Sequence, residues 1–116
     1  MNYEEMSDHE IDTQVTMIVF GCQNWQLSES NISFYHCGID GGEFHEQDIV
    51  NFCNNHSESA QLTELNKISV KYRAGNSSLK PMASSSERDD YYYADENPKR
   101  AAMIVFLMMK ENQNEQ

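Results

Sequence analysis

The residues from Ala101 to Met109 form an unbroken apolar run, and this run constrains the fold more than any other feature of the chain. Asn97 is a typical helix N-cap and Pro98 suits the first helical position, so the run predicts a helix over 98–110. Because that helix is apolar on every face, it has to be buried. A chain of 116 residues can bury one modest core. We therefore expect one domain, 1–116, built around this helix.

The N-terminal sequence predicts a second main helix. Ser7 followed by Glu10 is the pattern of a capping box, and Gly21 is a typical helix stop. Between these signals, apolar residues recur at helical spacing: Ile11, Val15 and Ile18. The pattern predicts a helix over about 8–20 with one face against the core.

The middle of the chain predicts strands and one short helix. Residues 32–39 are rich in β-branched and aromatic side chains and predict a strand, which the turn signal Asp40-Gly41-Gly42 ends. Residues 43–52 fit either a return strand or an extended loop. Asn55 can cap a short helix over about 56–65, and the alternation in 68–72 predicts another strand.

The remaining segments are less regular. Tyr91-Tyr92-Tyr93 fits a short strand, whereas residues 74–90 are rich in Ser, Asn and Gly and predict a mobile loop. Residues 111–116 are polar and predict a C-terminal tail. The elements together predict an α+β fold, in which a small, mostly antiparallel sheet packs against the two main helices.

Three segments of the chain carry motifs in a recognisable order. The most specific is the closing block from Asn97 to Met109, NPKRAAMIVFLMM. Met6–Ile11 (MSDHEI) precedes it, as does Cys53–Val70, in which CNN is followed by a short helix and NKISV. This arrangement resembles the NinX-type accessory proteins of lambdoid bacteriophages. The resemblance implies a phage or prophage gene expressed in a bacterial cytoplasm, and it implies no particular activity.

Charge is distributed very unevenly along the chain. Residues 1–66 contain 12 Asp and Glu and no Lys or Arg, and all eight Lys and Arg lie between Lys67 and Lys110. Binding to a phosphate backbone needs clustered cations, so we expect no direct binding to double-stranded DNA through the first part. An acidic surface suits a partner protein with a basic surface. The alternative is an acidic surface that is merely solvated.

The candidate partner-binding residues lie in this acidic part. Interfaces commonly combine charged residues with aromatic anchors. We therefore expect an acidic face that includes an aromatic side chain, formed by Asp40, Glu43, Glu46, Asp48 and Trp25.

A second candidate is an anion or nucleotide site at the start of the closing helix. Backbone N–H groups at a helix N-terminus attract anions, and Lys99 and Arg100 add positive charge there. Asn97 opens the helix and Tyr92 could stack on a base. The alternative is that Asn97 only caps the helix and the tyrosines pack in the core.

No recognised catalytic or metal-binding motif occurs in the sequence. Cys53 and His56 have a ligand-like spacing, but His36 and Cys37 are adjacent and would point to opposite faces of a strand. We expect no catalytic residues, no metal and no cofactor. An odd number of dispersed cysteines favours reduced thiols in a cytosol, and no apolar run is long enough to cross a membrane.

These observations lead to one hypothesis and one alternative. The hypothesis is a non-enzymatic accessory protein of the host bacterial cytoplasm that binds a host or phage protein, for instance to inhibit a host defence or nuclease complex. The alternative is a small-molecule binder that sequesters an anionic nucleotide signal. The sequence leaves the oligomeric state open, with a homodimer as one option.

Overall fold

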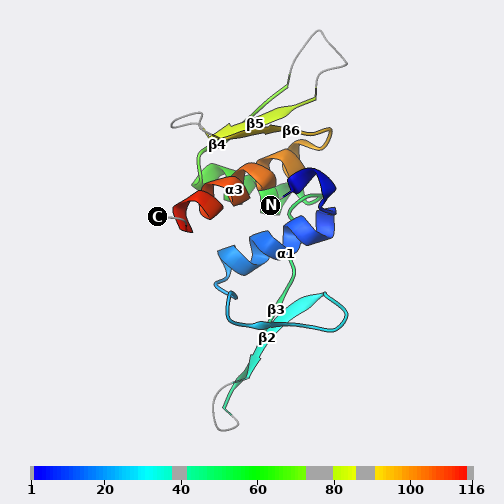
Figure 1. The fold of residues 1–116 in the computed structure, drawn as a ribbon, viewed down its shortest axis with the longest axis vertical. Helices are drawn as coiled ribbons and strands as arrows, with labels where there is room; N and C mark the ends of the chain where they lie inside the picture. Colours follow the sequence, from blue (N-terminus) through cyan, green and yellow to red (C-terminus); the bar gives the residue numbers. More distant parts are fainter. Residues whose placement is uncertain (1, 38–41, 73–79, 86–90, 115–116) are drawn as a thin grey trace.

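The computed structural model describes residues 2–37, 42–72, 80–85 and 91–114, and it confirms the α+β fold (Figure 1). Short helices and strands alternate irregularly along the chain. In order, the elements are η1 (Tyr3–Glu5), α1 (Asp8–Val19), β1 (Gln26–Leu27), β2 (Ser33–Cys37), β3 (Phe44–Asp48), α2 (His56–Leu65), β4 (Ile68–Lys71), β5 (Met82–Ser85), β6 (Tyr92–Ala94) and α3 (Pro98–Asn114).

The local signals of the sequence explain both main helices. The Ser7 hydroxyl accepts a hydrogen bond from the Glu10 N–H, and the Glu10 carboxylate accepts one from the Ser7 N–H, so the capping box of α1 is complete. After α1, Gly21 adopts a φ of 70°, a left-handed conformation that glycine adopts at little cost. At α3, the Asn97 side chain accepts from the Lys99 N–H, as expected for a cap.

The strands form two antiparallel sheets rather than the one sheet that the sequence suggested. One has the order β1-β2-β3 and the other the order β4-β5-β6. Only the second sheet packs against α3, and Figure 1 shows the two sheets at opposite ends of the molecule with the helices between them. We call the described residues of 25–48, which include β1, β2 and β3, the arm, and all other described residues the body.

The prediction of a loop over 74–90 is wrong for residues 82–85. They form β5, the central strand of the sheet β4-β5-β6, which we call the body sheet. Ile68 of β4 pairs with Ser85, and Ala83 pairs with Tyr93 of β6. Ala83 and Ser84 are buried, and small side chains at these positions let the strand lie close to α3. Residues 80–81 of the predicted loop have no regular secondary structure, and residues 74–79 and 86–90 lie outside the described part of the chain.

The main hydrophobic core cluster lies in the body, whereas Phe34 is buried within the arm. Ile104 is 0% exposed and Leu107 is 3% exposed, which confirms that α3 is a buried core helix. Residues of η1, α1, α2, β4 and β5 pack around it, including Tyr3, Ile11, Val15, Leu62, Ile68 and Ala83. No residue of the arm belongs to this cluster.

The closing helix is longer than expected, and this corrects the predicted tail. It runs to Asn114, so residues 111–114 of the expected 111–116 tail are helical. The hydroxyl of Tyr3 donates a hydrogen bond of 2.6 Å to the Glu111 carboxylate, which fixes the extra turn to the N-terminal segment. Residues 115–116 lie outside the described part.

The arm gives the molecule an elongated shape. The principal extents are 60 × 31 × 25 Å and the radius of gyration is 15.7 Å, whereas a compact chain of this length would have a radius of about 13 Å. A hydrogen bond of 3.0 Å from the Val50 N–H to the Thr16 hydroxyl of α1 holds the segment after β3 to the body. Within the described ranges, no helix has both the length and the apolar character needed to span a bilayer.

Candidate functional site

The pairing of β2 with β3 determines which side chains of the arm share a face. Tyr35 pairs with Glu46, Cys37 with Phe44 and Ser33 with Asp48. Paired residues of an antiparallel sheet point to the same side, and side chains alternate along each strand. Two aromatic residues and two carboxylates therefore lie on one face, which we call the acidic face: Tyr35, Phe44, Glu46 and Asp48.

Side-chain contacts order this acidic face. The rings of Tyr35 and Phe44 stack with centroids 6.2 Å apart and an angle of 23° between their planes. The Tyr35 hydroxyl donates to the Gln26 side-chain oxygen at 2.6 Å, and the Ser33 hydroxyl donates to the Glu46 carboxylate at 3.0 Å. The face is therefore held in shape by contacts among its own side chains.

The opposite face of the arm carries Trp25 and two histidines. His36 and His45 pair across β2 and β3, and the Trp25 ring lies over both, with centroid distances of 5.8 and 6.3 Å. Glu43 also belongs to this side, since its carboxylate lies 3.5 Å from His45 Nε2. Of the residues predicted to form one acidic surface, Glu46 and Asp48 share a face, whereas Trp25 and Glu43 lie on the other. Asp40 lies outside the described residues.

The arm and the adjoining end of α1 expose large apolar side chains. Phe44 is 61% exposed and Ile32 is 61% exposed. Three more exposed apolar residues lie in the same region: Val19, Phe20 and Leu27. Exposed apolar groups gathered in one region and bordered by polar residues commonly mark an interaction surface.

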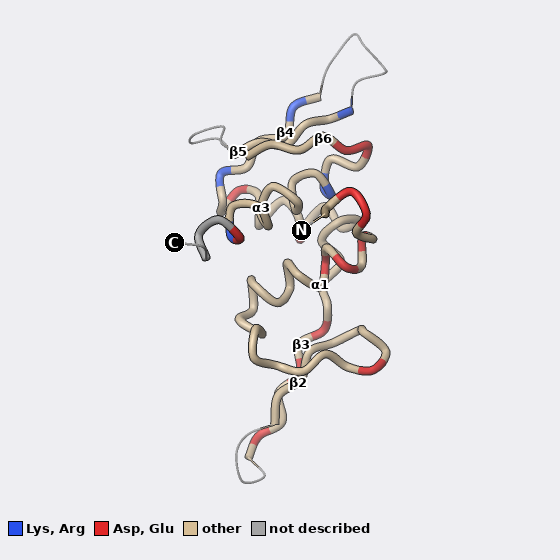
Figure 2. Tube along the Cα trace, in the orientation of Figure 1, with Lys and Arg blue, Asp and Glu red and all other residues tan. Residues whose placement is uncertain are grey.

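The charges of the molecule are segregated in space as well as in sequence. Figure 2 shows Lys and Arg on the body sheet and α3, while the arm and α1 carry Asp and Glu only. The arm thus combines exposed apolar groups with carboxylates, including Glu43, whose side chain is 87% exposed.

The predicted anion site at the start of α3 is not formed, because its arginine faces the protein. The Arg100 side chain is 11% exposed and lies 2.8 Å from the Asp8 carboxylate and 3.4 Å from that of Asp95. It also donates to the backbone carbonyls of Tyr3 and Met6 at 3.0 and 2.7 Å. These contacts engage most of the guanidinium donors, so Arg100 ties the N-terminal segment to α3.

The other predicted residues of that site lie apart from one another. The Asn97 side-chain amide donates to the Cys53 carbonyl at 2.6 Å and to the Asn54 side chain at 3.2 Å. Tyr92 is exposed on β6, and Lys99 lines a pocket on another side of the helix. The four residues therefore do not converge on one ligand position.

The three motif segments singled out in the sequence do meet, at a polar junction formed by Asp8, Cys53, Asn54, Asn97 and Arg100. Asn54 donates to the Asp8 carboxylate at 3.0 Å, and Arg100 binds the same carboxylate. Residues about 45 and 90 positions apart in the sequence thus share one hydrogen-bond network. Its contacts are internal, which assigns these motif residues a structural role.

Two buried groups border this junction. The Cys53 N–H donates to the Asp12 carboxyl at 2.9 Å, and burial raises the pKa of that carboxyl above its ordinary value. Burial, with the nearby charge of Asp12, also raises the pKa of the Cys53 thiol. A thiol of raised pKa stays protonated and is a poor nucleophile or metal ligand.

The cysteines of the chain do not pair with one another. All three cysteines are free, with Cys22 and Cys53 buried and Cys37 exposed. No three His, Cys, Asp or Glu side chains among the described residues lie close enough together to hold a metal ion.

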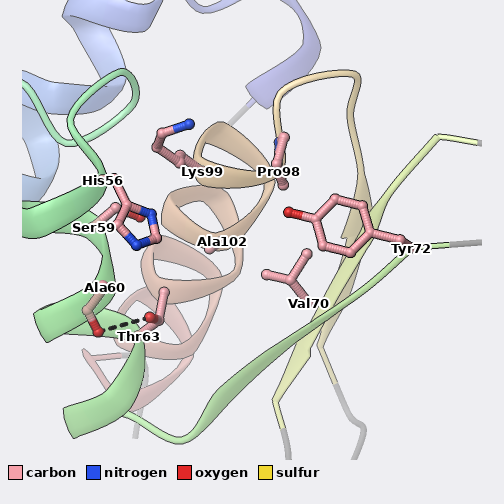
Figure 3. A pocket seen from close by; sticks show the side chains of 9 residues that line it. All are labelled: His56, Ser59, Ala60, Thr63, Val70, Tyr72, Pro98, Lys99 and Ala102. Carbon is pink, nitrogen blue, oxygen red and sulfur yellow. Dashed lines mark hydrogen bonds between the residues drawn. The ribbon is translucent and has the colours of Figure 1, made fainter.

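A pocket of about 200 Å³ lies between α2, β4 and the start of α3 (Figure 3). Its lining combines polar and apolar side chains: His56, Ser59, Thr63, Tyr72 and Lys99, with Ala60, Val70, Pro98 and Ala102. Sites for drug-sized ligands and cofactors usually measure roughly 300–1,000 Å³. The pocket is therefore small for a nucleotide.

The most informative arm residue that sequence reasoning missed is Phe44. The segment 43–52 fitted either a strand or a loop, and only a strand places Phe44, Glu46 and Asp48 on one side. These three residues alternate at every second position after the turn signal Asp40-Gly41-Gly42, and that alternation could have identified the acidic face.

A solved structure with a similar fold is the crystal structure of a phage protein from Bacillus cereus ATCC 14579. The TM-score is 0.63 at 14% sequence identity, and the alignment covers 91% of this chain and 89% of that chain. At this identity the likeness shows a shared fold. No protein-family model matches the sequence, and no curated protein matches it.

Proposed function

We propose that this chain is a non-enzymatic phage or prophage accessory protein that binds a host or phage protein through the acidic face of its arm. The observation that carries the proposal is the arm itself, a sheet outside the hydrophobic core that exposes apolar side chains beside carboxylates. The partner has a basic surface, because the arm offers negative charge and no Lys or Arg.

The composition of the acidic face supports protein binding in particular. Aromatic side chains such as Tyr35 and Phe44 are frequent anchors of protein interfaces, and carboxylates at their edge guide association with a basic partner. Leaving a Phe side chain in water forgoes roughly 1.5–3 kcal/mol of hydrophobic stabilisation. An interface that covers Phe44 would recover part of this free energy.

Two further observations support a phage origin. The fold is shared with a phage protein of Bacillus cereus, and the ordered motifs resemble NinX-type phage proteins. Inhibition of a host defence or nuclease complex in the bacterial cytoplasm is the specific role we propose, because a small binding protein can act by covering a surface of such a complex.

The nucleotide-binding alternative has less support from the geometry. Arg100 is engaged by Asp8 and by backbone carbonyls, and the pocket beside Lys99 is small for a nucleotide. Protein binding is therefore the better account of the exposed surface.

The test is quantitative capture from phage-infected host cells with three versions of the protein. Phe44→Ser removes an aromatic group of the acidic face, while Leu65→Ser changes a leucine of α2 in the body that is even more exposed than Phe44. A true partner binds the wild type and the Leu65 variant equally. It binds the Phe44 variant at least tenfold more weakly, as expected for an interface anchor worth about 1.4 kcal/mol or more. A partner retained equally by all three versions would contradict the proposal.

A further inference from the structure

Among the described residues, no strand lies beside the outer edge of β3. In the sheet order β1-β2-β3, β3 is the last strand, and no other described element pairs with it. An edge strand presents backbone N–H and C=O groups that can pair with another chain. The arm therefore offers hydrogen-bonding groups in addition to its exposed side chains.

The register between β2 and β3 shows which backbone groups of β3 face outward. The Ile49 N–H donates to the Ile32 carbonyl, so this pair is hydrogen-bonded across β2 and β3. Hydrogen-bonded and non-bonded pairs alternate in an antiparallel ladder, so His45 and Gln47 direct their backbone groups toward β2. Those of Phe44, Glu46 and Asp48 then point to the free edge. The Ser28 N–H bond to the Ser33 carbonyl on the β1 side agrees with this alternation.

The outward-facing residues are also those of the acidic face. Phe44, Glu46 and Asp48 offer their backbone at the edge and their side chains on the face that contains Tyr35. At the Asp48 end of β3, the Gln47 side-chain amide donates a hydrogen bond of 2.9 Å to the Asp48 carbonyl. This carbonyl already has a partner, so it marks the end of the backbone that an added strand would pair with. A single added strand could therefore pair with this backbone and contact these side chains at the same time.

We infer that the partner adds an extended basic segment as a fourth, antiparallel strand along the edge of β3. This inference rests on the proposed function and specifies its binding mode. Alternate residues of the incoming segment would lie opposite Asp48, Glu46 and Phe44. Opposite charges and aromatic pairs across strands are favourable, so the expected motif, read from its N-terminus, is Lys or Arg, any residue, Lys or Arg, any residue, then an aromatic residue.

A second copy of this chain fits the edge poorly. Two β3 strands paired antiparallel about Glu46 would place the Glu46 carboxylates opposite each other. Like charges directly opposite one another in a sheet are destabilising. Charge complementarity thus favours a basic segment from a different protein.

The test uses synthetic peptides and the intact, isotope-labelled protein. The probe is an acetylated and amidated peptide that contains Lys-Thr-Lys-Thr-Phe, and NMR follows the amide signals of Phe44, Glu46 and Asp48. If the segment pairs as inferred, its Lys and Phe amides face β3 and its Thr amides face away. N-methylation of the two Lys amides should weaken binding at least tenfold, whereas N-methylation of the two Thr amides should change it by less than threefold.

A matched pair of protein variants tests the side-chain part of the inference. Glu46→Gln with Asp48→Asn should weaken peptide binding at least tenfold, while Glu4→Gln with Glu5→Gln, which removes two exposed charges from the body, should not. Equal binding of the two methylated peptides would overturn strand addition in favour of charge attraction alone. Signals of β3 that shift with protein concentration alone would overturn it in favour of a second copy.

The outcome separates this inference from the function on which it rests. If the peptide fails to bind but capture of a partner still depends on Phe44, strand addition is wrong and protein binding by the arm stands. If the peptide does not bind and capture of cellular proteins does not depend on the arm, strand addition and protein binding by the arm are both wrong.

Discussion

The body and the arm differ in the exposure of their large apolar side chains and in the charges that they carry. Ile104 and Phe106 are buried in the body, whereas Ile32 and Phe44 in the arm are largely exposed. Basic residues lie in the body and the arm has none. Most of the large apolar side chains that form the core belong to the body, whereas the arm buries Phe34 and leaves Phe44, Ile32 and Leu27 exposed. This difference is the reason why we propose the arm as the part of the molecule that binds a partner.

The largest effect on stability that we predict tests whether the arm contributes to the hydrophobic core. Ile104→Ala should lower the free energy of unfolding by about 2–5 kcal/mol, because it leaves a cavity in the core. Ile32→Ala, the same change in the arm, should cost less than about 0.5 kcal/mol. Chemical denaturation measures both. Similar losses for the two variants would show that the arm belongs to the core.

A smaller effect tests the role of the arginine at the start of α3. Arg100→Ala should cost about 1–3 kcal/mol, because it leaves the Asp8 carboxylate and two backbone carbonyls without their donor. Lys99→Ala, one residue earlier, should cost less than about 0.5 kcal/mol, since no described ion pair holds that side chain. Thermal unfolding of both variants checks the prediction. Equal effects would mean that the junction does not stabilise the fold.

The helices and the strands differ in how far the sequence could predict them. The helices α1 and α3 could be predicted because their caps and apolar spacing are local signals, contained in segments such as Ser7–Glu10. The strand β5 could not, because Met82–Ser85 has weak strand propensity and becomes a strand through its two neighbours. The division into two sheets also depends on pairings that no local pattern encodes.

The candidate site shows the same limit. Glu46 and Asp48 could be predicted as surface acids from composition, but the side of the sheet they occupy depends on the register with β2. The sequence groups Trp25 with them as an aromatic anchor in the acidic part of the chain, but its ring contacts with His36 and His45 place it on the other face. The sequence predicts that Arg100 faces a ligand because it lies at a helix N-terminus, and no local pattern reveals its partner Asp8, which lies 92 residues away.

A prediction about pH concerns a buried acid of the body. Because burial raises the pKa of Asp12 in the folded state above the unfolded value of about 3.9, the folded chain binds the proton more tightly than the unfolded chain. Ionisation of Asp12 therefore costs stability. As pH rises above about 4, the wild type should lose stability relative to Asp12→Asn, whose amide can still accept from the Cys53 N–H.

Denaturation midpoints at a series of pH values between about 4 and 7 measure this difference. Asp48→Asn, which removes an exposed carboxylate of the arm, controls for the loss of one negative charge. If the wild type instead gained stability relative to Asp12→Asn as pH rose, hydrogen bonding to the charged carboxylate would outweigh its burial.

The smallest effect on stability that we predict comes from the charges of the arm, and it should accompany a clear effect on binding. Neutralising Glu43, Glu46 and Asp48 together should change the free energy of unfolding by less than about 0.5 kcal/mol, because all three are exposed. With the captured partner, the same variant should associate more slowly while its dissociation rate changes less, since rim charges mainly steer the encounter. The association rate of the wild type should fall as salt rises toward physiological levels, and that of the variant should be less sensitive. Stopped-flow or surface-based kinetics at two salt concentrations would detect this. An association rate that is equal in wild type and variant and independent of salt would mean that the acidity of the arm serves solvation alone, and that its apolar groups are the whole of its binding surface.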